Sequence, residues 1–178
     1  MPNRFAIRSY VRQDEAAVGR ITQDAFGPEH ATRSVWQLRY AHPIDELGLI
    51  VEDLDISAEN SDAITGRIVG SLQFWPIRIS AYPSLLLGPL AVKYYLRGLG
   101  VGRLLVKQAL SQISQRNWDF CLVSGEPDYY PKFGFKPVPD NVDWPGPIER
   151  QRLQFINLRS LDLEKLSDHT LPVLSDID

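Results

Sequence analysis

The chain has 178 residues, the length of one ordinary domain. Its 19 Lys and Arg residues and 22 Asp and Glu residues give a formal charge of −3, so it lacks the basic excess of proteins that bind nucleic acid. A hydrophobic fraction of 44% is typical of a folded globular protein and excludes a disordered one. One cysteine rules out an intrachain disulfide, and three scattered histidines form no metal-binding cluster. We therefore expect no metal and no nucleic-acid partner.

The N-terminus and the apolar runs bear on the location of the protein. Residues 1–8 carry charges every few positions and lack the apolar stretch of a signal peptide. The longest strongly apolar run, residues 85–92, is far shorter than the roughly 20 residues that cross a bilayer. We expect a cytoplasmic protein without a membrane partner.

In the first half of the chain, the hydrophobic pattern predicts three strands and two helices. Asp14 is the expected N-cap of the first helix, Gly27 ends it, and Pro76 is expected to stop the third strand. A polar hairpin loop is expected at 55–62. In chain order, the expected elements are a strand at 5–10, the helix after Asp14, a helix from 32 or 33 to about 40, and strands at 47–54 and 66–75.

Residues 84–92 are nearly all apolar, as in a central strand that is covered on both faces. The run contains Gly88-Pro89, and proline cannot donate a hydrogen bond within a sheet. We therefore predict a bulge at Gly88-Pro89, which leaves backbone groups of Leu90 to Val92 partly unpaired.

A helix is expected next, from about Gly100 to Gln115, followed by a strand at 120–124. Strand, helix and strand together form a crossover unit, which predicts that the strands at 84–92 and 120–124 are parallel. The remaining expected elements are a short helix at 127–133 with Gly134 as its C-cap, a loop at 138–147, a strand at 153–158 and a weakly patterned tail after Ser160.

The segment Arg97-Gly98-Leu99-Gly100-Val101-Gly102-Arg103 leads into the long helix. A helix start presents unpaired N–H groups and partial positive charge, and glycines remove the side chains that would keep a phosphate away. A nucleotide P-loop would need Lys and Ser or Thr after the last glycine, and a dinucleotide site would need G-x-G-x-x-G near the first strand. Neither pattern is present. A diphosphate-bearing ligand and a ligand-free turn both remain open on this segment alone.

Three linked motifs within residues 86–137 resemble the GNAT superfamily of coenzyme-A-dependent N-acetyltransferases, and most of all its small bacterial YhbS-like branch. They are the run Leu87-Gly88-Pro89-Leu90-Ala91-Val92, the glycine-rich turn, and Tyr129-Tyr130-Pro131-Lys132-Phe133-Gly134-Phe135. The resemblance implies an α/β fold (α+β by some schemes) with a mixed, mostly antiparallel sheet of six to seven strands, helices on both faces and splayed parallel central strands. We expect one domain over residues 1–178, with a cofactor-binding core at about 84–137, an acceptor-side region at about 1–80, and a C-terminal strand and tail at about 150–178.

The resemblance also implies the cosubstrate, acetyl-CoA, whose pyrophosphate would lie on the glycine-rich turn and whose pantetheine arm would pair with the splayed strand. The expected cofactor-binding residues are Leu90, Ala91, Val92, Arg97, Gly98, Leu99, Gly100, Val101, Gly102 and Arg103.

Tyr130 matches the position of the tyrosine that protonates the coenzyme thiolate in many GNAT relatives, and Tyr129 is a second candidate. A phenol suits this step because it is neutral and can donate a proton at pH 7. Glu126 is the candidate base, with Glu52 as an alternative. A backbone N–H at Leu90 or Val92 is expected to polarise the thioester carbonyl. Cys121 is interpreted as a buried thiol rather than an acyl carrier, which favours direct transfer.

We therefore predict an acetyl-CoA-dependent N-acetyltransferase that acts on a primary amine of a small molecule or a protein. A non-catalytic acyl-CoA-binding sensor and a structural domain with an empty turn are the alternatives. The expected partner is the amine acceptor, whose identity the sequence does not give, and a homodimer is left open.

Overall fold

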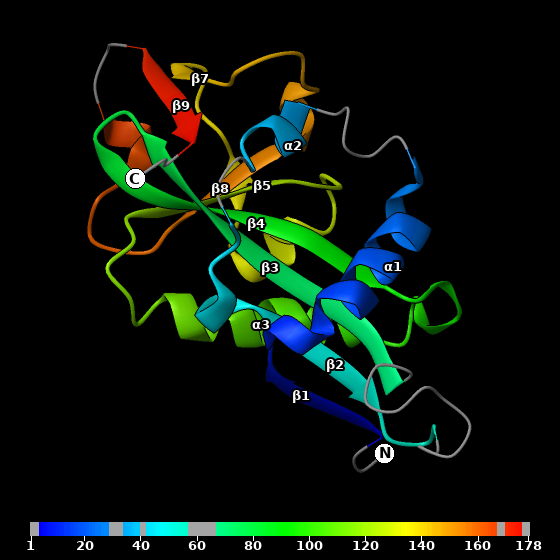
Figure 1. Ribbon diagram of the computed structural model, residues 1–178. Helices are drawn as coiled ribbons and strands as arrows, with labels where there is room; N and C mark the ends of the chain where they lie inside the picture. The colour runs from blue at the N-terminus through cyan, green and yellow to red at the C-terminus, as the bar shows by residue number, and fades with distance from the viewer. Residues whose placement is uncertain (1–3, 29–33, 40–41, 57–66, 167–169, 176–178) are drawn as a thin grey trace.

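The computed structural model describes residues 4–28, 34–39, 42–56, 67–166 and 170–175 (Figure 1). These residues form nine strands and three α-helices. The helices are α1 (Glu15–Phe26), α2 (Ser34–Gln37) and α3 (Val101–Ile113). The strands are β1 (Phe5–Ser9), β2 (Leu49–Asp53), β3 (Ile68–Ile79), β4 (Tyr82–Val92), β5 (Phe120–Ser124), β6 (Lys136–Pro137), β7 (Val142–Asp143), β8 (Leu153–Asn157) and β9 (Leu171–Ser175).

One mixed sheet organises the molecule, with strand order β1-β2-β3-β4-β5-β8-β6. Most neighbours are antiparallel, while β4 and β5 are parallel and are joined through α3. Strand β2 pairs only with the first part of β3. Strand β9 pairs with the last part of β3, on the same edge. The predicted fold class and the predicted parallel pair are both confirmed.

Helices α1 and α3 cover opposite faces of the sheet (Figure 1). The buried stripe of α3, with Val101, Leu105 and Ala109, packs on one face. Ala17, Val18 and Ile21 of α1 pack on the other. Successive strand residues point to opposite faces, so each face supplies alternate side chains to its helix. Among the described residues, no helix is long and apolar enough to span a bilayer.

The described residues form nine strands, whereas six or seven were expected. The loop expected at 138–147 contains the two-residue strand β7, and the weakly patterned tail contains β9. Val173 of β9 packs in the core formed by the second half of the sheet and the C-terminal segment. Strand β9 is set by this distant pairing rather than by its own hydrophobic pattern.

The expected end of β3 at Pro76 is wrong, because β3 continues to Ile79. The main-chain oxygen of Phe74 accepts a hydrogen bond from the amide of Ile44, so Phe74 directs its backbone polar groups away from β4. Pro76, two residues on, faces the same edge, between the stretch paired with β2 and the stretch paired with β9. A missing N–H therefore breaks no ladder bond at this position.

One predicted helix end and one predicted side-chain cap differ from the structure. Helix α2 ends at Gln37 instead of about Tyr40, and Thr32, Arg33 and Tyr40 lie outside the described residues, as do positions 57–62 of the expected hairpin loop. Asp14 is at the N-cap position of α1, but its side chain does not cap the helix. Its carboxylate instead binds the Arg8 guanidinium through two contacts of 2.7 Å and accepts a hydrogen bond from the Val11 amide.

This contact fixes the start of α1 against β1 and should matter for stability. Burial alone would raise the pKa of Asp14, but the bonds from Arg8 and Val11 outweigh it and hold the pKa below its ordinary value. The stabilisation is therefore present above the unfolded pKa of about 3.9 and is lost as the pH falls through the lower folded value. We expect Asp14→Asn to lower the free energy of unfolding by about 1–3 kcal/mol at pH 7.

Urea denaturation at a series of pH values measures this effect. The difference between wild type and Asp14→Asn should shrink below about pH 4. Asp24→Asn, which changes an exposed residue of the same helix, should have little effect. A difference that stays constant down to low pH would contradict the assignment.

Candidate active site

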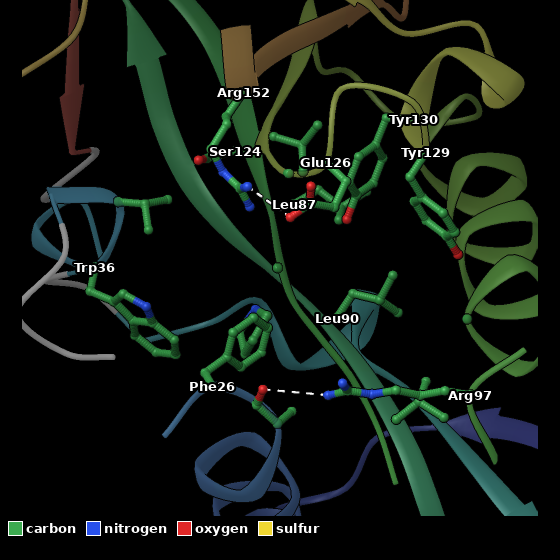
Figure 2. A pocket seen from close by; sticks show the side chains of 18 of the residues that line it. Phe26, Trp36, Leu87, Leu90, Arg97, Ser124, Glu126, Tyr129, Tyr130 and Arg152 are labelled. Carbon is green, nitrogen blue, oxygen red and sulfur yellow. Dashed lines mark hydrogen bonds and ion pairs between the residues drawn. The ribbon is translucent and has the colours of Figure 1, made fainter. Parts of the chain in front are cut away.

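A cavity of about 1250 Å³ lies where β4 and β5 separate (Figure 2). Its walls come from the end of α1, the α2 segment, β4, the glycine-rich turn, the start of α3 and the chain that follows β5. The described lining residues are Ala25, Phe26, Ser34, Val35, Trp36, Arg39, Leu87, Gly88, Pro89, Leu90, Val92, Leu96, Arg97, Gly98, Gly100, Val101, Gly102, Arg103, Val123, Ser124, Gly125, Glu126, Tyr129, Tyr130, Pro147, Ile148, Glu149 and Arg152.

The separation of β4 and β5 opens one edge of β4. Their pairing ends at Leu86 and Leu122, although β4 continues to Val92. The predicted bulge is present, because Gly88 and Pro89 together face the single residue Gln73 of β3. Along the described chain, residues 87–92 thus have no strand partner on the β5 side. Their backbone polar groups on this side are available to a ligand.

The glycine-rich turn brings the start of α3 to the cavity. Gly98 and Gly100 have φ values of +83° and +87°, which L side chains rarely adopt. Within the described part of the chain, no side chain caps the helix at Gly100, so the amides of its first turn are not blocked by these side chains. A Cβ at either glycine would meet no atom within 4 Å. The turn therefore offers an open cradle with N–H donors and partial positive charge.

Eight of the ten expected cofactor-binding residues line this cavity. Ala91 does not, because its side chain is buried on the α1 side of the sheet. Leu99 does not either, because its side chain is 58% exposed and lies outside the lining.

Two arginines flank the cradle. Arg97 donates to the main-chain oxygen of Ala25 at 3.5 Å, and its guanidinium carbon lies 5.3 Å from the ring centroid of Tyr94. Figure 2 shows Arg97 directed across the turn toward the end of α1. Arg103 is exposed on the first turn of α3. Both guanidinium groups add positive charge at the helix start.

Tyr130 lies beside the bulge of β4 and is only 6% exposed. Its ring packs on Gly125, where a Cβ would overlap the ring, and edge-on against Tyr129 and Phe135. Burial is the main cause that raises the pKa of Tyr130 well above the ordinary value. Its hydroxyl is directed into the cavity in Figure 2. It is a neutral donor available to a ligand.

Tyr129 points elsewhere. Its hydroxyl is 3.0 Å from the position that a Cβ on Gly102 would take, so it lies against the first turn of α3. Figure 2 shows its ring directed toward this helix, away from the Tyr130 hydroxyl. The two tyrosines therefore serve different parts of the cavity.

Of the described lining residues, only Glu126 and Glu149 carry carboxylates. Glu126 forms an ion pair of 2.7 Å with Arg152. Glu52 lies outside the cavity, where it binds Arg8 at 2.8 Å. Cys121 is fully buried as expected, and burial raises the pKa of its thiol.

The cavity contains residues that the sequence pattern did not single out. Gly125 positions the ring of Tyr130, and Arg152 holds Glu126. Arg39 enters from the segment after α2. None of these positions belongs to a motif, because each acquires its role from a contact distant in sequence. Trp36 also lines the cavity, whereas Trp75 does not.

The sequence matches no protein-family model and no curated protein. The structure, in contrast, is similar to many solved ones. A GNAT family N-acetyltransferase from Escherichia coli, YhbS in complex with CoA, has a TM-score of 0.72 at 22% identity, with coverage of 97% of this chain and 91% of that chain. A GNAT family acetyltransferase from Brucella melitensis, in complex with acetyl-CoA, has a TM-score of 0.62 at 24% identity and covers 86% and 87% of the two chains.

The chain has the GNAT fold. Ard1 from Thermoplasma volcanium is also similar, with a TM-score of 0.58 at 17% identity over 87% of this chain and 98% of that one. The resemblance drawn from residues 86–137 is thus confirmed for the fold over nearly the whole described chain. Within the GNAT fold, the splayed β4 and β5, the uncapped start of α3 and Tyr130 meet in one cavity.

Proposed function

We propose that this protein is an acetyl-CoA-dependent N-acetyltransferase that transfers the acetyl group directly to an amine of a small molecule or a protein. One observation carries the proposal: the open edge of β4 and the uncapped, side-chain-free start of α3 line the same cavity. The first suits an amide-containing arm and the second suits a diphosphate. The similar structures from Escherichia coli and Brucella melitensis were solved with CoA and acetyl-CoA respectively, which supports the same ligand here.

The residues present fit this cosubstrate. At Gly98 and Gly100 no described atom lies within 4 Å of where a Cβ would be, and Arg97 and Arg103 supply charge for phosphate oxygens. A volume of about 1250 Å³ exceeds the range of about 300–1,000 Å³ that is usual for one small ligand. The excess leaves room for an acceptor beside the cosubstrate.

When bound, acetyl-CoA supplies a thioester whose carbonyl carbon is attacked by the neutral amine. The nitrogen–carbon bond forms, the carbon–sulfur bond breaks, and the products are an N-acetyl amide and the free thiol. A backbone N–H on the open edge of β4, at Leu90 or Val92, polarises the carbonyl oxygen. Tyr130 donates its hydroxyl proton to the departing sulfur, and the proton lost from the amine nitrogen restores it.

Glu126 is the proposed acceptor of the amine's proton, directly or through water, and it passes this proton on to the Tyr130 phenolate. Its carboxylate lines the cavity, and the 2.7 Å contact with Arg152 fixes its position. Cys121 takes no part, because a fully buried thiol with a raised pKa is a poor nucleophile. Direct transfer therefore needs no acyl-enzyme.

Two measurements on the purified chain test the proposal. Calorimetric titration with CoA and with acetyl-CoA should show binding, and S-acetylpantetheine, which lacks the diphosphate, should bind far more weakly. Incubation with acetyl-CoA and a panel of amines, amino acids, polyamines and peptides should release thiol together with a product heavier by one acetyl group. Binding without transfer to any amine would favour an acyl-CoA sensor, and absence of binding would refute the proposal.

Arg97→Ala should weaken CoA binding about tenfold, because one charge-assisted contact to a phosphate is worth about 1–3 kcal/mol. The loss should diminish at high salt, since Arg97 is exposed. Titration at two salt concentrations measures this. Arg20→Ala removes an exposed arginine of α1 outside the cavity lining and is the control. Equal CoA affinity in both variants would exclude Arg97 from the site.

A further inference from the structure

Arg39 is an unusual residue of this cavity. It lies two residues after α2 and lines the cavity wall. Its Nε and Nη1 atoms are buried and have no hydrogen-bond partner among the described residues. The guanidinium carbon lies 3.9 Å from the centroid of the Trp36 ring and 5.8 Å from that of Trp75.

Stacking on Trp36 covers the flat face of the guanidinium but gives its N–H groups no hydrogen-bond acceptor. Its five N–H bonds lie in the plane of the group and point outward, so a stacked arginine still needs acceptors at its edge. All these unpaired groups are donors, so the missing partner is an acceptor. Burial lowers the pKa of Arg39 to about 9, which leaves the group charged at neutral pH.

The other arginines that line the cavity have different surroundings. Arg97 and Arg103 flank the glycine-rich turn, and Arg152 is paired with Glu126. Among the described residues, the group that acts electrostatically on Arg39 is the Tyr130 phenol, and no carboxylate does so. The Arg39 guanidinium is therefore a buried positive charge that has no counterion among the described residues. It is separate from the glycine-rich turn at which the phosphates are proposed to bind.

Arg39 is also close to the proposed site of transfer. Its Nη2 atom is 3.0 Å from the position of a Cβ on Gly88, so the guanidinium lies against the bulge of β4. Tyr130, the proposed proton donor, is near enough for each group to affect the other's pKa. An anion held by Arg39 would thus lie beside the point where β4 opens.

We propose that Arg39 binds the carboxylate of the acceptor, so that the acetylated amine belongs to an amino acid whose carboxylate lies close to its amino group. The proposal rests on the proposed function and names its substrate class. A planar carboxylate matches the edge of a guanidinium through two parallel hydrogen bonds. In an α-amino acid, two bonds separate the carboxylate carbon from the nitrogen, so binding at Arg39 places the amine next to the bulge.

The test compares acceptors that differ only in the carboxylate. Each member of a panel of L-amino acids with apolar, hydroxyl, acidic and basic side chains is assayed beside its α-carboxamide, and kcat/KM is measured for both. Wild type should prefer the acid of the best pair. In Arg39→Gln the ratio of acid to amide kcat/KM should fall about 10- to 100-fold. Arg39→Lys should recover only part of the ratio, because an ammonium cannot bind both oxygens in parallel.

Arg116→Gln is the matched control, because it removes an exposed positive charge outside the cavity lining. Its ratio should equal that of wild type. An aminoalkyl phosphate is included as a competing anion. Preference for it over every amino acid, or an unchanged acid-to-amide ratio in Arg39→Gln, would overturn the proposal.

The outcomes separate this proposal from the proposed function. Efficient acetylation of carboxamides, with no preference for acids, would refute the role of Arg39 and leave the acetyltransferase in place. Calorimetric titration of the CoA-saturated protein with the best amino acid provides a readout besides turnover, and binding there should depend on Arg39. Thermal unfolding of Arg39→Met distinguishes a structural role: an unchanged or higher Tm is expected for a binding residue, and a large fall would overturn the proposal.

Discussion

Tyr130→Phe should lower kcat for acetyl transfer by about 10²–10⁴-fold while CoA still binds with its original affinity. The substitution removes one oxygen atom and keeps the ring that packs on Gly125 and Phe135. Loss of the hydroxyl proton leaves the departing sulfur as a thiolate in a buried site, where an uncompensated charge is costly. Stopped-flow or steady-state thiol release, together with calorimetric titration of CoA, measures both quantities.

Tyr129→Phe is the control that the chain itself offers. The two residues are adjacent, their rings contact each other at a centroid distance of 5.1 Å, and both line the cavity. The Tyr129 hydroxyl, however, lies against Gly102 at the start of α3. Its loss should change kcat by less than about tenfold, an effect of the order of one hydrogen bond. A reversed order of the two effects would assign the proton donor to Tyr129.

The pH dependence gives an independent check on Tyr130. Its pKa is raised above the ordinary value of about 10, mainly by burial, so the phenol keeps its proton throughout the neutral and mildly alkaline range. We expect kcat with wild type to show no decline that is due to Tyr130 up to about pH 10. A decline with a midpoint near 8 that disappears in Tyr130→Phe would contradict the environment described for this residue.

Much of the cofactor half of the molecule could be predicted from the sequence. The bulge at Gly88-Pro89, the helix after the glycine-rich turn and the turn at Gly134 are local features, because a missing N–H or a missing side chain restricts the backbone wherever it occurs. The parallel pairing of β4 and β5 follows from the crossover between them. These local rules were enough to locate the edge of β4 that the cavity uses.

The rest depends on contacts between distant parts of the chain. Pro76 is tolerated within β3 because two other strands happen to leave its edge free, and β9 becomes a strand because β3 accepts it there. Arg39 could not be predicted for the same reason: its role depends on distant contacts, and its neighbours in the sequence do not indicate a binding site. Its buried position arises only when the segment after α2 meets Gly88 and Trp75. The acceptor side of the cavity is therefore the part for which sequence patterns are least informative.

Gly100→Val should weaken CoA binding at least about 100-fold, more than any loss of a single charged contact at the turn. Gly100 is the residue directly before α3. A side chain there would project into the open cradle where the diphosphate is proposed to lie. A branched side chain would both exclude the phosphates from the amides of the first helical turn and leave Arg97 without its ligand. Turnover with S-acetylpantetheine, which has no diphosphate, should fall much less than turnover with acetyl-CoA.

Backbone strain must be separated from this blocking effect, because valine disfavours the left-handed conformation at any position. Gly134 offers the matched control: its φ of +92° and ψ of 6° nearly equal the +87° and 1° of Gly100, but it lies outside the cavity lining. A Cβ at Gly134 would make an ordinary contact of 3.4 Å with Ile156. Gly134→Val should therefore lower the Tm about as much as Gly100→Val while it retains CoA binding. Equal loss of CoA binding in the two variants would mean that strain, and not occupation of the cradle, is the cause, and the diphosphate would then have to be placed elsewhere.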